Sequence, residues 1–234
     1  MTNFDINSIL RKNKENNFVF DEKDHKYFVN AEEFVSVTKL ISKYFVFDEL
    51  KAAEFVAAKN MTTIGDVLEE WESIRNRGSL IHDIADRFAK KEELSKIELE
   101  KIKGVISFFE NEGYNVLASE IKVFSKKHKV AGTIDLVLEK EGKVFIADYK
   151  TNKKEIVKDD YFDKALDPFS EFPNNKFHIY SMQLSVYSTI LMEEYGVDIY
   201  DFFVVQLKEE DYKIVSLMDL RYEANMLLDL AAED

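Results

Sequence analysis

The sequence predicts a mixed α/β (α+β) fold in which a central mixed β-sheet is flanked by helices. Apolar residues recur at helical spacing through much of residues 38–112, whereas the apolar runs after residue 114 are typical of strands. The 234 residues are 46% hydrophobic, enough for one substantial core or two small ones. We therefore expect a single domain over residues 1–234. It divides into an N-terminal hairpin and helical region (1–113) and a core of sheet and helices (114–234).

The first half is predicted to contain a β-hairpin and then helices. Apolar residues alternate loosely between Phe18 and Val35, with a polar turn at residues 21–26, as in a hairpin. The stretch Ser36-Val37-Thr38 can supply an N-cap for the helix that begins near Thr38. Further helices are expected at residues 49–58, at 63–91 with Gly78 as a candidate break, and at 95–112 with Gly113 as the stop.

The second half is predicted to supply most of the sheet. Strands are expected at residues 116–124, 130–138 and 143–149, with a turn at 139–142 between the last two. Residues 151–174 are polar, contain both prolines and predict a long loop, a length that is usually functional or disordered. A helix at 176–195, strands at 200–207 and 212–217 and a helix at 221–231 complete the pattern.

The composition excludes several kinds of site. Without cysteine there is no disulfide, thiolate zinc site or cysteine-ligated iron–sulfur cluster, so a metal would be held by oxygen and imidazole, which favours Mg²⁺ or Mn²⁺. The net charge of -13 argues against indiscriminate coating of nucleic acid. Lysines nevertheless gather at positions 122–129 and 150–158. A local basic track and a solvated lysine-rich surface explain them equally well.

Targeting signals are also missing from the sequence. No run approaches the roughly eighteen apolar residues of a membrane span, and the opening Met-Thr-Asn-Phe-Asp lacks the basic and apolar regions of a signal peptide. We expect a cytoplasmic protein without a membrane partner.

The clearest chemical signal is Gly132-Thr133-Ile134-Asp135, followed by Asp148-Tyr149-Lys150. Alternate residues of a strand share a face, so Asp148 and Lys150 point the same way, and a short hairpin can bring Asp135 beside them. The two carboxylates can then hold a hard divalent cation for phosphodiester hydrolysis, and the Lys150 ammonium would orient the attacking water or stabilise the developing charge. The alternative is an exposed charge pattern. The apolar run 144–147 disfavours an exposed charge pattern, because charged residues at the end of a buried strand are seldom simply solvent-exposed.

These residues resemble the RecB-type branch of the PD-(D/E)xK nucleases. Residues 77–82 look like its helical R-G-x-x-x-H signature, residues 132–150 are similar to its G-x-x-D and D-x-K pair, and residues 183–187 to its Q-x-x-x-Y helix. Ser36-Val37-Thr38 after a hairpin also resembles the stand-alone members of DNA viruses and phages. One departure is Asp148 at a position where Glu is commoner, a change that this branch accepts.

The resemblance implies a restriction-endonuclease-like core and hydrolysis of DNA with Mg²⁺ or Mn²⁺ and no iron–sulfur cluster. It suggests an exonuclease that acts in recombination, repair or replication, in the host cytoplasm if the protein is phage-encoded. Lys150, Asp135 and Asp148 are the expected catalytic residues. The expected metal ligands are His82, Asp135, Asp148 and the backbone carbonyl of Tyr149, with Glu120 as a further candidate. The expected DNA-binding residues are Arg77, Gln183, Tyr187, Lys126, Lys127, Lys129, Lys153 and Lys154.

Each of these assignments has a plainer alternative. His82 could be a satisfied core histidine, Gln183 and Tyr187 could only pack, and Arg77 and Glu120 could face solvent. A structure-specific endonuclease, a non-catalytic DNA-binding module and an unrelated α/β binding protein are the rival functions. The sequence contains no G-x-x-x-x-G-K-[ST] motif, so unwinding would need a helicase or a single-strand-binding or recombination protein as partner.

Overall fold

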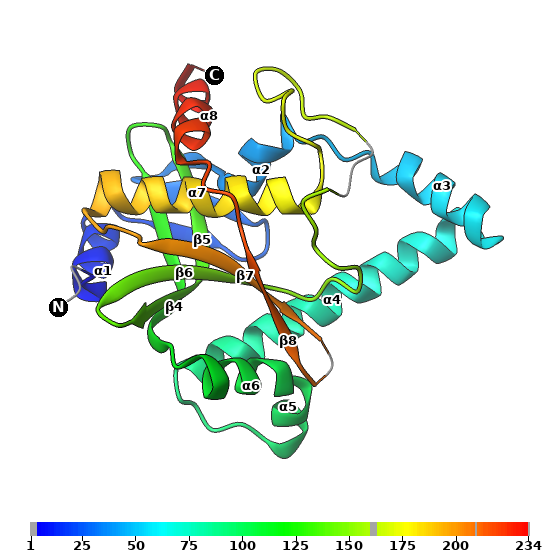
Figure 1. Cartoon of the computed structure of the whole chain (residues 1–234). Coiled ribbons are helices and arrows are strands. Elements are labelled where there is room, and N and C mark those ends of the chain that lie inside the picture. The colour runs from blue at the N-terminus through cyan, green and yellow to red at the C-terminus, as the bar shows by residue number, and fades with distance from the viewer. Residues whose placement is uncertain (1–3, 160–162, 209, 234) are drawn as a thin grey trace.

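A mixed sheet of eight strands organises the molecule (Figure 1). The computed structural model describes residues 4–159, 163–208 and 210–233. The sheet order is β1-β2-β3-β5-β6-β7-β8, and β4 pairs with the other side of β5. The β3–β5 and β6–β7 pairs are parallel and the others antiparallel. The strands are β1 Val19–Asp21, β2 Lys26–Val29, β3 Glu32–Ser36, β4 Asn115–Ser125, β5 Val130–Lys140, β6 Lys143–Lys150, β7 Asp201–Leu207 and β8 Tyr212–Ser216.

Strand β5 changes partner along its length. Its first residues, Val130 and Ala131, pair with β3, and the stretch from Leu136 onward pairs with β6. The β5–β6 ladder ends at the pair Leu136 and Ala147, after which β6 continues along β7 alone. The two strands therefore separate at the next residues, which are Asp135 and Asp148.

Helices cover both faces of the sheet (Figure 1). On one face lies α7, whose central turns are buried all round, with α2 and α8 beside it. On the other face α4 and α6 pack against Leu136, Ala147 and Phe203, and the short α5 precedes α6. The helices are α1 Ile6–Glu15, α2 Val37–Ser42, α3 Glu49–Asn60, α4 Ile64–Ala89, α5 Lys96–Lys101, α6 Lys103–Glu112, α7 Lys176–Tyr195 and α8 Arg221–Glu233.

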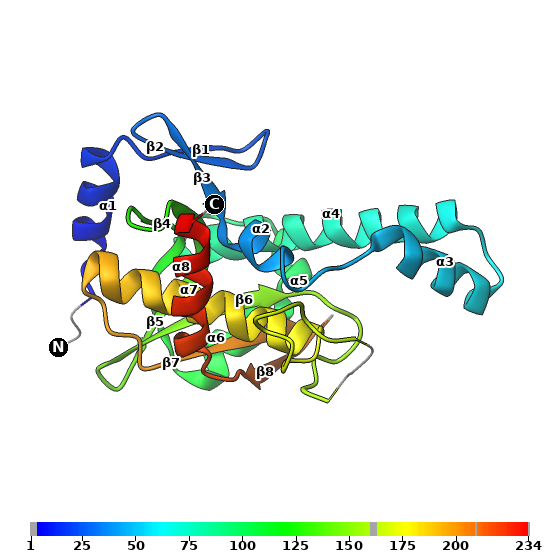
Figure 2. The ribbon, with the colours of Figure 1, turned by 90° about the horizontal axis from the view of Figure 1, so that it is seen from above.

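Helix α4 is long and only partly packed on the sheet. A capping box between Thr63 and Asp66 begins it, and α3 runs back along its first half. Figure 2 shows that this helical pair projects from the body of the molecule. The second half of α4 contributes Ile81 and Ile84 to the core, so the helix connects the projection to the sheet.

The predicted fold class is confirmed, with local differences. Helix α1 was not expected; Asp5 caps it, and Ile9 anchors it in the core. Gly78 does not break α4 but lies buried in its interior. A Cβ added at this position would lie 3.0 Å from the hydroxyl of Thr151, so the helix comes close to Thr151 here. The helix expected at 95–112 is two, since Ile102 has non-helical dihedral angles.

The segment 151–174 is largely the predicted loop, although residues 160–162 lie outside the described residues. Its described parts are anchored by the buried Ile156 and Phe169 and by a bridge between Lys164 and Pro173. In the described part of the chain, no helix is long and apolar enough to cross a membrane.

Candidate active site

The centre of the site is the point where β5 and β6 separate. Because Tyr149 no longer has a β5 backbone partner there, its N–H donates to Oδ2 of Asp135 at 2.9 Å. The same Asp135 oxygen lies 3.3 Å from Nδ1 of His82, on α4. The strand separation therefore leaves a carboxylate facing a histidine across the gap between sheet and helix.

Glu120 approaches the same point from β4. Its neighbours Ser119 and Ile121 pair with Leu136 and Ile134, so the register puts Glu120 opposite Asp135. It has a φ of 48°, in the left-handed region that a residue with a side chain seldom adopts. One ligand atom each from His82, Glu120 and Asp135 lies within 4.8 Å of the other two.

The carboxylates of this cluster are crowded in a poorly solvated place. Burial, followed by repulsion from Asp148, raises the pKa of Asp135 from 3.8 to about 6, against the opposing effects of His82 and Lys150. Burial, then repulsion from Asp135 and Asp86, raises the pKa of Glu120 from 4.5 to about 8. Carboxylates that are costly to ionise together are what a divalent cation would stabilise, and two oxygen donors with an imidazole suit Mg²⁺ or Mn²⁺.

Asp148 faces the lysine side of the site. Its side chain is 5% exposed; Oδ2 forms an ion pair with Lys150, and Oδ1 accepts from Gln183 at 3.5 Å. Lys150 Nζ also lies 4.7 Å from the centre of the Tyr180 ring. Burial opposes the charge of Lys150, but Asp148, Tyr180 and Asp135 outweigh it, so the pKa is raised and the ammonium persists at neutral pH.

A close contact beneath β5 fixes the orientation of these strands. A Cβ added at Gly132 would lie 2.7 Å from the hydroxyl of Tyr187 and closer still to its ring. The Tyr187 side chain is therefore packed directly on the strand that contains Asp135. This contact explains why glycine is needed three residues before the aspartate.

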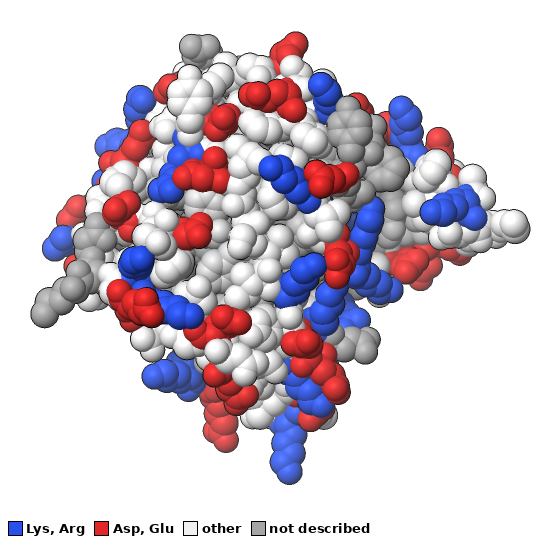
Figure 3. All heavy atoms as spheres, viewed as in Figure 1, with Lys and Arg blue, Asp and Glu red and all other residues white. Residues whose placement is uncertain are grey.

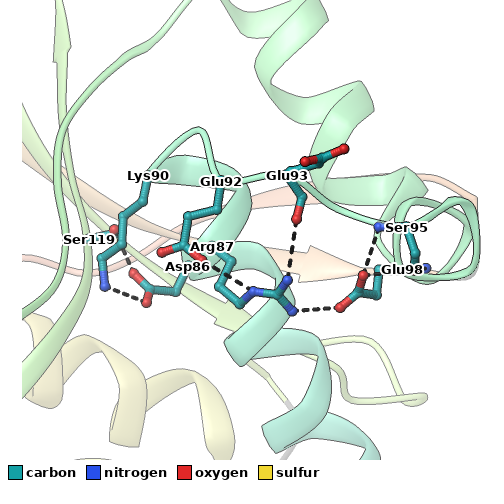
Figure 4. A network of polar contacts seen from close by, with 8 residues as sticks. All are labelled: Asp86, Arg87, Lys90, Glu92, Glu93, Ser95, Glu98 and Ser119. Atoms are coloured by element: carbon teal, nitrogen blue, oxygen red, sulfur yellow. Dashed lines mark hydrogen bonds and ion pairs between the residues drawn. The ribbon is translucent and has the colours of Figure 1, made fainter.

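The C-terminal part of α4 is held by the polar network in Figure 4. Asp86, one turn after His82, accepts from the Ser119 hydroxyl at 2.7 Å and pairs with Lys90 at 2.6 Å. Because Ser119 precedes Glu120, this bond joins α4 to β4 beside the carboxylate cluster. Arg87 binds Glu98 at 2.5 Å and thereby ties the end of α4 to α5.

The cluster opens into a cleft with a volume of about 960 Å³. Its lining includes the metal-ligand candidates together with cations from three elements: Lys90 on α4, Lys122 on β4 and Lys150 on β6. This size and mixture of charges can accommodate an extended polyanion next to a cation site.

The structure brings some of the predicted site residues together and leaves others apart. His82, Glu120, Asp135, Tyr149 and Lys150 all line the cleft. Gln183 and Tyr187 are buried, 8% and 3% exposed; Gln183 donates to Asp148 and Tyr187 packs on β5 at Gly132, and their contact with DNA stays a prediction.

The predicted basic residues are scattered. Lys127 and Lys129, in and next to the β4–β5 turn, pair with Asp229 and Glu32, and Lys126 lies beside them, outside the cleft lining. Lys154 is exposed after β6 and is likewise not a lining residue. Arg77 and Lys153 line a second cavity on the adjoining side of α4.

Four cleft and site residues were missed from the sequence: Asp86, Lys90, Lys122 and Tyr180. A signal existed for two of them. Asp86 lies four residues after His82 and Tyr180 three before Gln183, spacings that put each pair on one helix face. Lys122 was seen only as a member of a lysine group.

Comparison with known proteins gives one family match. A family model described as the PD-(D/E)XK nuclease superfamily matches residues 99–223, more than half of the chain. This stretch includes Glu120, Asp135, Asp148 and Lys150 but not His82. A comparison with curated proteins finds no match.

Two solved structures are similar at 14% sequence identity. The match to the crystal structure of SSO0001 covers 99% of this chain and 85% of the SSO0001 chain, with a TM-score of 0.41. The match to a protein from Eubacterium rectale, described as a candidate exonuclease, covers 86% of this chain and 78% of that protein's chain, with a TM-score of 0.40. Similarities this distant carry no argument about activity.

Proposed function

Because the chain belongs to the PD-(D/E)XK nuclease superfamily, we propose that it is a DNA nuclease that needs Mg²⁺ or Mn²⁺. The observation that supports this most directly is the cluster of His82, Glu120 and Asp135, with Lys150 beside it in one cleft. A structural role for this cluster is disfavoured because burial, followed by repulsion from neighbouring carboxylates, raises the pKa of both Glu120 and Asp135.

The metal would be held by His82, Glu120 and Asp135, with Asp148 and the Tyr149 carbonyl as the remaining candidates. The N–H and C=O of a strand residue point to the same neighbour, so a Tyr149 N–H directed at Asp135 supports a carbonyl directed to that side too. A bound divalent cation supplies polarisation of the scissile phosphate and a lowered pKa for the attacking water.

Lys150 has the role of a cation in this proposal. Since its ammonium stays protonated, it can donate to the attacking water or to the phosphate oxygens but is a poor general base. Asp148 holds it in the site, and Gln183 in turn holds Asp148. The lysines that line the cleft, Lys90 and Lys122, would bind neighbouring phosphates.

The proposal extends to an exonuclease of the RecB-type branch, similar to the stand-alone phage-encoded members, with a role in recombination, repair or replication. Its support is the position of four motifs: R-G-x-x-x-H on α4, G-x-x-D on β5, D-x-K on β6 and Q-x-x-x-Y on α7. A helicase or a single-strand-binding protein is the partner that such an enzyme would need on duplex DNA.

A time course on end-labelled linear DNA beside a covalently closed circle tests both levels of the proposal. With Mg²⁺ or Mn²⁺ we expect products from the linear ends and survival of the circle; opening of the circle would indicate an endonuclease. A Lys150→Ala preparation is the matched control for contaminating nucleases. Equal activity of this control, or no metal-dependent cleavage of either DNA, would refute the proposal.

A further inference from the structure

A second cavity, of about 590 Å³, adjoins the cleft. The two share Ile74, Thr151 and Asn152 as lining residues, so they lie on either side of one common wall. α4, the α5–α6 connection, the segment after β6 and the end of β7 enclose the second cavity. None of the metal-ligand candidates lines it.

The rim of this cavity is basic. Among the described residues, Arg77, Lys101, Lys153 and Lys208 line it, against the carboxylate of Glu210, which is already paired with Lys103 at 3.2 Å. In a chain of net charge -13 such an excess of cations is unusual. Figure 3 shows lysines and arginines gathered on this side of the molecule, where the segment after β6 lies against α4.

Most of these cations are not used in holding the fold together. Within the described part of the chain, Arg77 and Lys101 are exposed and have neither an ion pair nor a hydrogen bond from their side chains. Lys208 only donates to the carbonyl of Lys153 at 3.4 Å, and Lys153 lies 3.6 Å from Glu70. They are therefore available to an anion.

The interior of the cavity is apolar. Its lining includes Ile81, Ile102, Val105 and Leu207, all of which belong to the core on that face of the sheet. A phosphate alone would contact only the rim. A nucleotide satisfies both parts, because the flat faces of its base pack on apolar side chains while its phosphate is anionic.

From this arrangement we infer that the second cavity is a subsite for an unpaired nucleotide of the strand whose neighbouring phosphate lies in the cleft. The inference rests on the proposed function and adds a substrate preference to it. A base within a duplex has both faces stacked and its edge paired, so only an unpaired nucleotide can enter. The DNA at this side of the cut is therefore single-stranded.

The test measures binding to short labelled oligonucleotides in EDTA, where no cleavage occurs. In the double variant Lys101→Gln/Lys208→Gln we expect about tenfold weaker binding of single-stranded DNA and a salt slope shallower by about 1.4, from two lost phosphate contacts. The control Lys14→Gln/Lys59→Gln removes the same charge from α1 and α3. Equal salt slopes in the two double variants, or an equal loss for single-stranded DNA and a blunt hairpin duplex, would overturn the subsite.

A second measurement isolates the base. A series of oligonucleotides carries one abasic nucleotide, each at a different position. We expect the wild type to bind one member of the series more weakly than the others. Lys101→Gln/Lys208→Gln should bind all members of the series equally well. Equal affinity at every position would refute the nucleobase site. All of these measurements are made without metal, so they test the nucleotide subsite separately from the proposed nuclease function. A protein that does not cleave DNA can still have the subsite, and an active nuclease can lack it.

Discussion

Removing the charge of Glu120 should make the metal-free protein more stable at alkaline pH. Its pKa rises from 4.5 to about 8 in the folded protein. Between these values the folded state holds a proton that the unfolded state has released, so stability falls as pH rises through this window and is constant above it. At about 1.4 kcal/mol for each pH unit, reduced for partial solvation, the loss is about 3 to 5 kcal/mol.

Glu120→Gln retains the shape of the neutral side chain and eliminates this titration. We expect it to unfold like the wild type at pH 5 and at a clearly higher urea concentration at pH 8 to 9, with EDTA present throughout. The pH dependence of the free energy of unfolding that remains in Glu120→Gln below about pH 6 comes from Asp135, whose pKa is also raised. Glu54→Gln, an exposed position on α3, is the control and should follow the wild type. A flat wild-type profile, or parallel profiles for wild type and Glu120→Gln, would refute the reasoning.

Three other outcomes follow from the site. Asp135→Ala should weaken Mn²⁺ binding at least about tenfold in calorimetry, and undiminished affinity would remove it from the ligand set. Lys150→Ala should slow cleavage about a hundredfold. It should also lower stability by about 3 kcal/mol in urea unfolding, because Asp148 is left buried without its partner; normal cleavage would contradict the role. Gly132→Ala should cost about 2 to 4 kcal/mol by displacing Tyr187, and a wild-type thermal midpoint would show that the strand yields instead.

The approach of Asp135, Asp148 and Lys150 was predictable because local patterns encode it. Asp135, Asp148 and Lys150 lie on two strands whose turn and apolar runs fix their pairing, so their approach follows from period-two geometry. The helix predicted at residues 176–195 is α7 with the same bounds, and the structure shows Asn175 as its N-cap and Gly196 as its C-cap.

Other features depend on contacts that the sequence pattern does not specify. Arg77 is five residues before His82, roughly 140° away around the helix axis, so the two face different cavities. A helical projection could have revealed this. The left-handed backbone of Glu120 could not be foreseen, since it arises inside strand β4, where no glycine marks it. The ion pairs of Lys127 and Lys129 likewise depend on acidic residues far away in the sequence, Asp229 and Glu32.

The β4–β5–β6 meander has a consequence for how the site assembles. It provides Glu120, Asp135, Asp148 and Lys150 from neighbouring strands joined by short turns, which form early and locally in folding. Only His82 comes from α4. Repulsion among these carboxylates is therefore built into the meander, and the apolar contacts of α4 together with the Ser119–Asp86 hydrogen bond hold the helix beside it. Separation of α4 from the sheet should be an accessible opening of the metal-free protein, and its amide protons should gain protection first when a divalent cation is added.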